Sequence, residues 1–150
     1  MDSRLRTSMT SQPVSISSDV SIADAQEVMR SWGMRHLPVV DGEELVGVIS
    51  DRDILRSFAL HKAPSTQVAE VMTRSPYQVK QDVGVAIVAK TMAINKFGCA
   101  IVTDFSGRVV GIFTTTDALQ LLAKILHEPQ ERDYSLMRLS EYLSWQRAVA

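Results

Sequence analysis

Gly47-Val48-Ile49-Ser50-Asp51-Arg52-Asp53 is a stretch whose pattern returns later in the chain as Gly111-Ile112-Phe113-Thr114-Thr115-Thr116-Asp117. Each copy begins with glycine and two apolar residues, continues with a hydroxyl residue, and ends with an aspartate three positions after that hydroxyl. An apolar run followed by Ser or Thr and then by helical spacing predicts a strand that leads directly into a capped helix. One copy alone is a weak signal, but two copies at matching places are a strong one.

The repeat extends well beyond these two stretches. Met9-Thr10-x-x-Pro13 matches Met72-Thr73-x-x-Pro76 at an offset of 63 residues, and Asp41 matches Asp104 at the same offset. One extra residue enters the second copy in the turn after Asp104, so the offset becomes 64 from Gly47 onward. Two units of about sixty residues therefore fill most of the chain.

The predicted strand-to-helix junctions have a chemistry of their own. A helix N-terminus offers free backbone N–H groups and a positive dipole end, which suit an anion, and a short carboxylate suits the diol of a ribose. Asp53 and Asp117 are the two carboxylates so placed. The alternative is that both only interact with their own helix dipoles, an effect of about 0.3–1 kcal/mol each. A metal pair formed by Asp51 and Asp53 is a weaker alternative, because no further ligands are apparent.

Composition limits the class of protein. Of the 150 residues, 45% are hydrophobic and 22% charged, which fits one globular domain. A net charge of -1 without a basic stripe argues against nucleic-acid binding. No apolar run approaches the ~20 residues of a membrane helix, and no apolar signal segment is apparent, so we expect a cytoplasmic protein that does not bind membranes. Cys99 is the single cysteine, so we expect neither an internal disulfide nor a cysteine-based zinc site.

Periodicity and turn signals predict the order β-α-β-β-α in each unit. In the first unit the predicted elements are an extended run at 14–16, a helix from a capping box at Ser21 to Gly33, strands at 37–40 and 45–50, and a helix at 51–60. In the second unit they are 77–79, 83–94, 99–103, 109–113 and 115–126, after a linker at 61–65 and a helical turn at 68–72.

We therefore predict an α+β (α/β) fold of two units that pack sheet to sheet about a pseudo-twofold axis. The predicted boundaries are 1–8 for a flexible arm, 9–62 and 63–127 for the two units, and 128–150 for a C-terminal extension. Within that extension, 133–148 is predicted as an amphipathic helix with Leu136, Leu139, Tyr142 and Leu143 on one face. This helix could fold back over the module, pair with its copy in a dimer or, as a third use, recruit another protein.

These motifs resemble those of the CBS domain family, and the tandem resembles a CBS pair, or Bateman module. The resemblance covers residues 9–126. It depends on the two Met-Thr-x-x-Pro motifs, on His36-Leu37-Pro38-Val39-Val40-Asp41, and on the two Gly-h-h-Ser/Thr-x-x-Asp endings, where h is apolar. It implies a regulatory module that binds an adenosine-containing ligand, such as AMP, ADP, ATP or S-adenosylmethionine, in the clefts between the units. It also implies a homodimer.

The resemblance assigns roles to particular residues. It implies that Asp53 and Asp117 hold ribose hydroxyls and that Ser50 and Thr114 contact phosphate or ribose. It places Met34-Arg35 and Phe97-Gly98 beside the base, and lets Arg35 and His36 reach the phosphates of the facing site. The second unit departs from the first, because Gly98-Cys99 stands where the first has Arg35-His36. We therefore predict that one site favours phosphorylated ligands and the other tolerates uncharged adenosine compounds.

Nothing in the sequence predicts catalysis. No nucleophile-and-base constellation surrounds His36, and Cys99 in its strand is better explained as a small buried residue than as a nucleophile. We expect no catalytic cofactor and no metal. The leading hypothesis is a non-catalytic sensor that passes ligand binding to an unidentified protein partner. The alternative is a structural module, with vestigial sites, that serves dimerisation or docking; an enzyme is a distant third.

Overall fold

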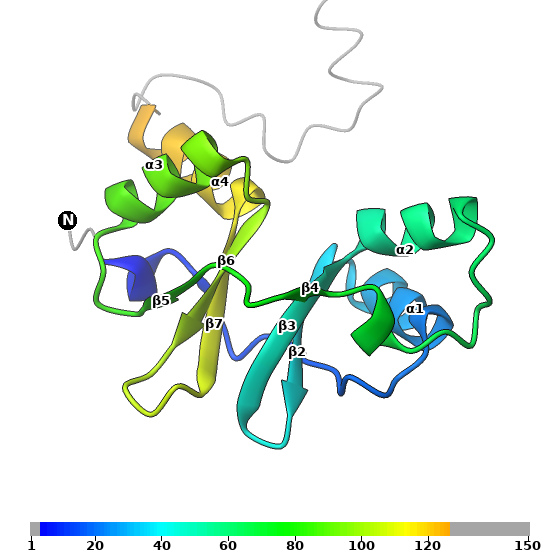
Figure 1. The fold of residues 1–150 in the computed structure, drawn as a ribbon. Helices are drawn as coiled ribbons and strands as arrows, with labels where there is room; N and C mark the ends of the chain where they lie inside the picture. Colours follow the sequence, from blue (N-terminus) through cyan, green and yellow to red (C-terminus); the bar gives the residue numbers. More distant parts are fainter. Residues whose placement is uncertain (1–3, 127–150) are drawn as a thin grey trace, which may run out of the picture.

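The computed structural model describes residues 4–126. It contains two α/β units, each with two helices against a small sheet (Figure 1). The first unit contains α1 (Ile22–Trp32), β2 (His36–Asp41), β3 (Glu44–Ser50) and α2 (Asp51–Ala59). The second contains β5 (Gln78–Lys80), α3 (Val85–Asn95), β6 (Cys99–Thr103), β7 (Val109–Thr114) and α4 (Thr115–Leu126). The predicted order of elements is confirmed in the second unit and, apart from its first strand, in the first unit, with shifts of a few residues at the ends of the elements.

The two units differ at their first strand. In the second unit β5 pairs in parallel with β6 over three residues. In the first unit the run predicted at 14–16 makes only an isolated bridge between Ile16 and Val39. The extended conformation at Val14–Ile16 therefore contributes little to the sheet of the first unit.

Each repeat supplies an edge strand to the other unit. The short strand β1 (Thr10–Ser11), which precedes the first unit, pairs antiparallel with β7. The matching strand β4 (Thr73–Arg74), which precedes the second unit, pairs antiparallel with β3. The sheets therefore have the orders β1-β7-β6-β5 and β2-β3-β4. Figure 1 shows the blue N-terminal segment beside the second unit and green β4 beside the first.

Glycines at the start of the repeated motif make this exchange possible. A Cβ added at Gly47 would lie 2.6 Å from Sδ of Met72 and 2.9 Å from the carbonyl oxygen of Thr73. A Cβ at Gly111 would overlap the side chain of Met9 in the same way. The Met-Thr motif of each repeat thus packs on the glycine of the other unit, which explains why the two motifs occur together.

The exchange corrects the expectation of a flexible arm over 1–8. Residues 5–7 form the 3-10 helix η1 (Leu5–Thr7), and Leu5 is fully buried in the core of the second unit. Its backbone N–H donates to the carbonyl of Val83 at 2.9 Å. In the same way Val68 of η2 (Val68–Glu70) is fully buried in the core of the first unit. Packing therefore crosses the boundaries that the repeat suggested, because the helical turn at the start of the second repeat belongs to the first core, and part of the N-terminal arm belongs to the second core.

Strand β6 is buried on both faces. In β6, Ala100 and Val102 face the core under α3 and α4, whereas Cys99 and Ile101 face the opposite sheet. The cluster between the sheets also includes Ile112, with partly buried residues of both units around it. The units therefore pack through their sheets, as predicted. The predicted C-terminal helix at 133–148 lies outside the described residues. Within 4–126, no helix is long and apolar enough to cross a membrane.

Candidate functional site

The two strand-to-helix junctions form matching capping boxes. In the first, Ser50 is the N-cap of α2, and its Oγ accepts from the backbone N–H of Asp53 at 3.2 Å. Oδ2 of Asp53 accepts in return from the backbone N–H of Ser50 at 2.9 Å and from its hydroxyl at 2.7 Å. These reciprocal bonds satisfy two otherwise free donors at the junction and fix the carboxylate in place.

The second junction repeats this geometry. Oδ2 of Asp117 accepts from the backbone N–H and from the hydroxyl of Thr114, both at 2.7 Å, and the Asp117 N–H donates to Thr114 Oγ1 at 3.2 Å. In both junctions the bonds use Oδ2, and Oδ1 has no hydrogen-bond partner among residues 4–126. Each carboxylate therefore has a second oxygen that can accept bonds from a ligand.

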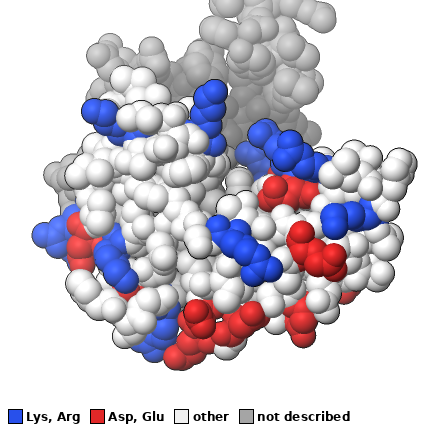
Figure 2. Space-filling view, in the orientation of Figure 1, with Lys and Arg blue, Asp and Glu red and all other residues white. Residues whose placement is uncertain are grey.

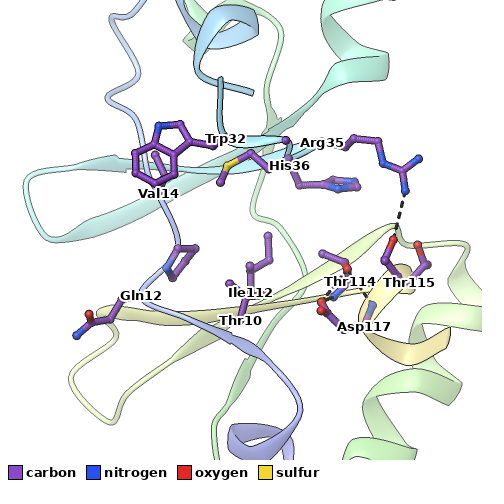
Figure 3. Close-up of a pocket in the computed structure, with 14 residues that line it drawn as sticks. Thr10, Gln12, Val14, Trp32, Arg35, His36, Ile112, Thr114, Thr115 and Asp117 are labelled. Carbon is purple, nitrogen blue, oxygen red and sulfur yellow. Dashed lines mark hydrogen bonds between the residues drawn. The ribbon is translucent and has the colours of Figure 1, made fainter. Parts of the chain in front are cut away.

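A pocket of about 390 Å³ lies between the units at the second junction (Figure 3). We call it the Asp117 pocket. The second unit contributes Thr114 and Asp117 from β7 and α4, and the first contributes Met34, Arg35 and His36 from the end of α1 and the start of β2. Figure 3 shows Trp32 and Val14 at one end of the pocket and Arg35 at the other. The pocket thus has an apolar end, a carboxylate and a cationic end.

Arg35 reaches across the interface to the start of α4. Its guanidinium donates to Oγ1 of Thr116 at 3.3 Å. The first turn of α4 contributes Thr115 and Thr116 to the pocket as well. A permanent cation beside a helix N-terminus is an arrangement that favours an anionic group.

The matching pocket of about 280 Å³ lies at the first junction, and we call it the Asp53 pocket. It is lined by Ser50 and Asp53 from the first unit and by Phe97 and Gly98 from the second. The rings of Phe97 and Tyr77 stack at 5.4 Å between centroids. This pocket is smaller, and the helix that begins beside it starts with an aspartate, Asp51, rather than with threonine.

His36 lies between the two pockets and lines both. A Cβ added at Gly98 would lie 2.7 Å from Nε2 of His36. The imidazole therefore fits because residue 98 has no side chain. Burial lowers the pKa of His36 below its usual value, against the opposing effect of the Asp51 carboxylate, while the Arg35 guanidinium lowers it further. The imidazole is therefore neutral near neutral pH. The side chain of His36 in the first unit thus packs against Gly98 of the second unit.

Cys99 is buried at the sheet interface. Burial raises the pKa of its thiol to about 12, with a smaller contribution from the Asp53 carboxylate. The thiol is thus protonated at physiological pH and is a poor nucleophile. Among residues 4–126, no three His, Cys, Asp or Glu side chains lie where they could share a metal ion.

All nine predicted ligand-binding residues line the two pockets. Met34, Arg35, Thr114 and Asp117 line the Asp117 pocket, Ser50, Asp53, Phe97 and Gly98 line the Asp53 pocket, and His36 lines both. The geometry places them together; their roles in binding stay predictions.

Sequence reasoning missed several other lining residues. Thr10 lines the Asp117 pocket, and Thr73 lines the Asp53 pocket. Both belong to the repeated Met-Thr-x-x-Pro motif, so their repetition was a usable signal. The prediction also found no cation for the second site, whereas Lys96 lines the Asp53 pocket. Lys96 has φ +57° at the end of α3, where the matching residue of the first unit is Gly33. Each pocket therefore has a cation, and the two pockets differ in its kind and position: Arg35 lines the Asp117 pocket and Lys96 lines the Asp53 pocket.

Two units with a pocket at each strand-to-helix junction have the geometry of a module that could bind small molecules. Both halves of the chain match the family model described as CBS domain, over residues 4–60 and 68–124. The chain therefore belongs to the CBS domain family, as a tandem pair.

Relatives and solved structures agree with this assignment. The L-aspartate semialdehyde sulfurtransferase of Methanocaldococcus jannaschii is 34% identical over 115 residues, which are 75% of this chain and 22% of that protein. The chain spans about a fifth of the length of the curated enzymes that it matches. Among solved structures, the CBS domain pair of protein MJ0100 in complex with 5′-methylthioadenosine and S-adenosyl-L-methionine is 31% identical, with a TM-score of 0.75, and covers 79% of this chain and 98% of that one.

A second solved structure, CBSX2 from Arabidopsis thaliana in complex with AMP, is 26% identical, with a TM-score of 0.73. The alignment covers 83% of this chain and 98% of that one. CBS pairs similar to this chain thus bind two kinds of adenosine compound, one with a phosphate and one without.

Proposed function

We propose that this chain is a non-catalytic regulatory module that binds an adenosine-containing ligand between its two CBS units. The Asp117 pocket takes a phosphorylated ligand such as AMP, and the Asp53 pocket takes adenosine compounds with little need for a phosphate. In both pockets the free Oδ1 of the capping aspartate accepts from the ribose hydroxyls. No catalytic cofactor is required, because the ligand is a regulatory signal.

The observation that carries this proposal is the arrangement around Asp117. Its Oδ2 is held by Thr114, which leaves Oδ1 for a ligand, while Arg35 of the other unit lies at the start of α4. A carboxylate that can bind ribose hydroxyls and a guanidinium that can bind phosphate thus line one pocket of a size that suits a nucleotide. The solved CBS pairs with AMP and with S-adenosyl-L-methionine support the ligand class.

The signal would be the relative position of the units. Each pocket has walls from both units, so a ligand favours the arrangement in which both walls contact it. We infer that a protein partner or a second copy of the chain reads this change. The predicted homodimer is tested by light scattering of the free and ligand-bound protein.

The test is calorimetry and thermal unfolding with AMP, ATP, adenosine and S-adenosylmethionine. A ligand at 100 times its Kd should stabilise the native state by about 2.7 kcal/mol. Asp53→Asn and Asp117→Asn keep an oxygen for the N-cap bonds but lose the charge, so each should weaken binding at its own site by about tenfold or more.

Two outcomes would decide against the proposal. No stabilisation by any of these compounds would favour the alternative, a structural module whose pockets are vestigial. Binding that is unchanged in both single variants and in the double variant would show that the ligand lies elsewhere.

A further inference from the structure

The helix pair of the second unit leaves an apolar groove uncovered. The groove lies between α3 and α4 and has a volume of about 760 Å³. Leu119, Leu122 and Ile125 of α4 line it and are 66%, 49% and 60% exposed. Although α4 is rich in leucine, none of its residues is fully buried within the described chain. A contiguous apolar surface of this kind is typical of a docking site.

The groove is specific to the second unit. Repeat positions that are apolar on α3 are polar on α1: Ala89 corresponds to Gln26, and Ala93 to Arg30. In the first unit Arg30 forms an ion pair with Glu27 at 2.8 Å on this surface. Figure 2 shows the α3–α4 side as a largely uncharged surface with cations at its edge, whereas the α1–α2 side carries both signs of charge. The helices of the CBS unit thus do not require an apolar outer surface.

The chain itself continues from one end of this groove. Leu126 is the last residue of α4 and is 67% exposed, and the sequence runs on from it to residue 150. Leu136, Leu139 and Leu143 follow at spacings of three and four, which place them on one face of a helix. Pro129 disfavours an unbroken helix from α4 into this segment, so the sequence permits a change of direction between the two.

The lengths match. Residues 127–132 can span at most about 20 Å when extended, which is enough for a reversal. A helix over 133–148 would be about 24 Å long, compared with about 18 Å for α4, so it could run back along the whole groove. A tether this short also gives an effective concentration in the millimolar range, well above that of any free chain.

The apolar spacing, the length of the tether and the length of the helix thus all favour the C-terminal segment of the same chain as the occupant of the groove. We propose that residues 133–148 fold back as an amphipathic helix into the α3–α4 groove of the same chain. The groove shares Lys96, Phe97 and Gly98 with the Asp53 pocket, so the docked helix lies next to that pocket.

Amide hydrogen exchange of the full chain, read by mass spectrometry, tests this proposal. Amides of 133–148 should be protected in the parent, and Leu119→Gln should increase their exchange rates at least tenfold. Leu55→Gln is the matched control, because Leu55 occupies the same repeat position in the first unit and is 59% exposed. Leu139→Gln, on the other side of the contact, should have the same effect as Leu119→Gln. Unchanged exchange across β2 and β3 of the first unit and across β6 and β7 of the second would verify that each variant folds.

Unprotected amides over 133–148 in the parent, or equal effects of Leu119→Gln and Leu55→Gln, would overturn the proposal. A mixture of two variants distinguishes docking within one chain from docking onto a second copy. Leu119→Gln labelled with ¹⁵N is combined with an excess of unlabelled Leu139→Gln, which offers an intact groove. Labelled peptides that stay exposed support docking within one chain. Recovery of their protection would place the segment on another copy and overturn the proposal.

Discussion

The Asp117 and Asp53 pockets have the same backbone geometry at the capping aspartate and differ in the side chains that line them. Both have the same capping box, with Oδ2 of the aspartate bound to the N-cap residue. The Asp117 pocket adds Arg35 against a helix that starts with threonines, while the Asp53 pocket adds Lys96 against a helix that starts with Asp51. The repeat thus preserves the capping geometry of the aspartate and varies the electrostatics around it. This difference is what would let one module distinguish two adenosine ligands.

The largest expected effect concerns a feature that the units share. Gly47→Ala and Gly111→Ala each force a Cβ into the methionine of the exchanged segment. Each should lower the free energy of unfolding by about 1–3 kcal/mol. Gly47→Ala should have the larger effect, because its Cβ also meets the backbone carbonyl oxygen of Thr73, whereas the Cβ of Gly111→Ala meets only the flexible side chain of Met9. Chemical denaturation measures this.

Gly84→Ala is the control for these variants. Its Cβ would meet only Cδ1 of Ile87, at 3.9 Å. Gly84 is the N-cap of α3, where alanine is less favourable than glycine, so we expect a loss of up to about 1 kcal/mol from capping alone and none from a clash. If Gly47→Ala and Gly111→Ala lower the free energy of unfolding by no more than Gly84→Ala does, the proposed packing of the exchanged strands on these glycines is wrong.

A smaller effect is expected where the units differ. Gly98→Ala places a Cβ 2.7 Å from Nε2 of His36, and the imidazole must move to accept it. We expect a loss of about 1 kcal/mol in the parent and a smaller loss in a His36→Ala background. Denaturation of the four proteins of this cycle gives the coupling. Additive effects would mean that His36 and Gly98 do not depend on each other.

The smallest effect is the pH dependence due to His36. Since burial lowers its pKa in the folded state, the unfolded chain binds more protons once the pH falls below the ordinary histidine pKa of about 6.5. His36 therefore makes the protein less stable as the pH falls from 7 to 5, and His36→Gln should flatten this part of the profile. Thermal unfolding across that range measures it. An unchanged profile in His36→Gln would contradict the neutral imidazole that burial favours.

The sequence was informative where local signals determine structure. The capping boxes at Ser50 and Thr114 and the core strands follow from residue type and spacing, because caps and alternation are short-range effects. The exchange of β1 and β4 could not be predicted in this way. Strands of two residues have no periodicity, and their partners are chosen by the tertiary packing of Met9 and Met72.

The site was predictable to a similar extent. The nine predicted residues belong to motifs that repeat or to the resemblance, and the structure brings them to two pockets. Lys96 was missed because it follows a helix end at a position where the first unit has glycine, so the repeat gave no signal. Leu5 was missed for a comparable reason, since one apolar residue in a polar arm shows no pattern.

The central claim is that the Asp117 pocket recognises a phosphate through Arg35. We would measure it by titrating AMP and adenosine into a protein with Asp53→Asn, so that the Asp117 pocket dominates, with and without Arg35→Gln. We predict that Arg35→Gln weakens the binding of AMP by about tenfold or more and leaves the affinity for adenosine unchanged. An equal loss for both ligands, or no loss for either, would contradict it.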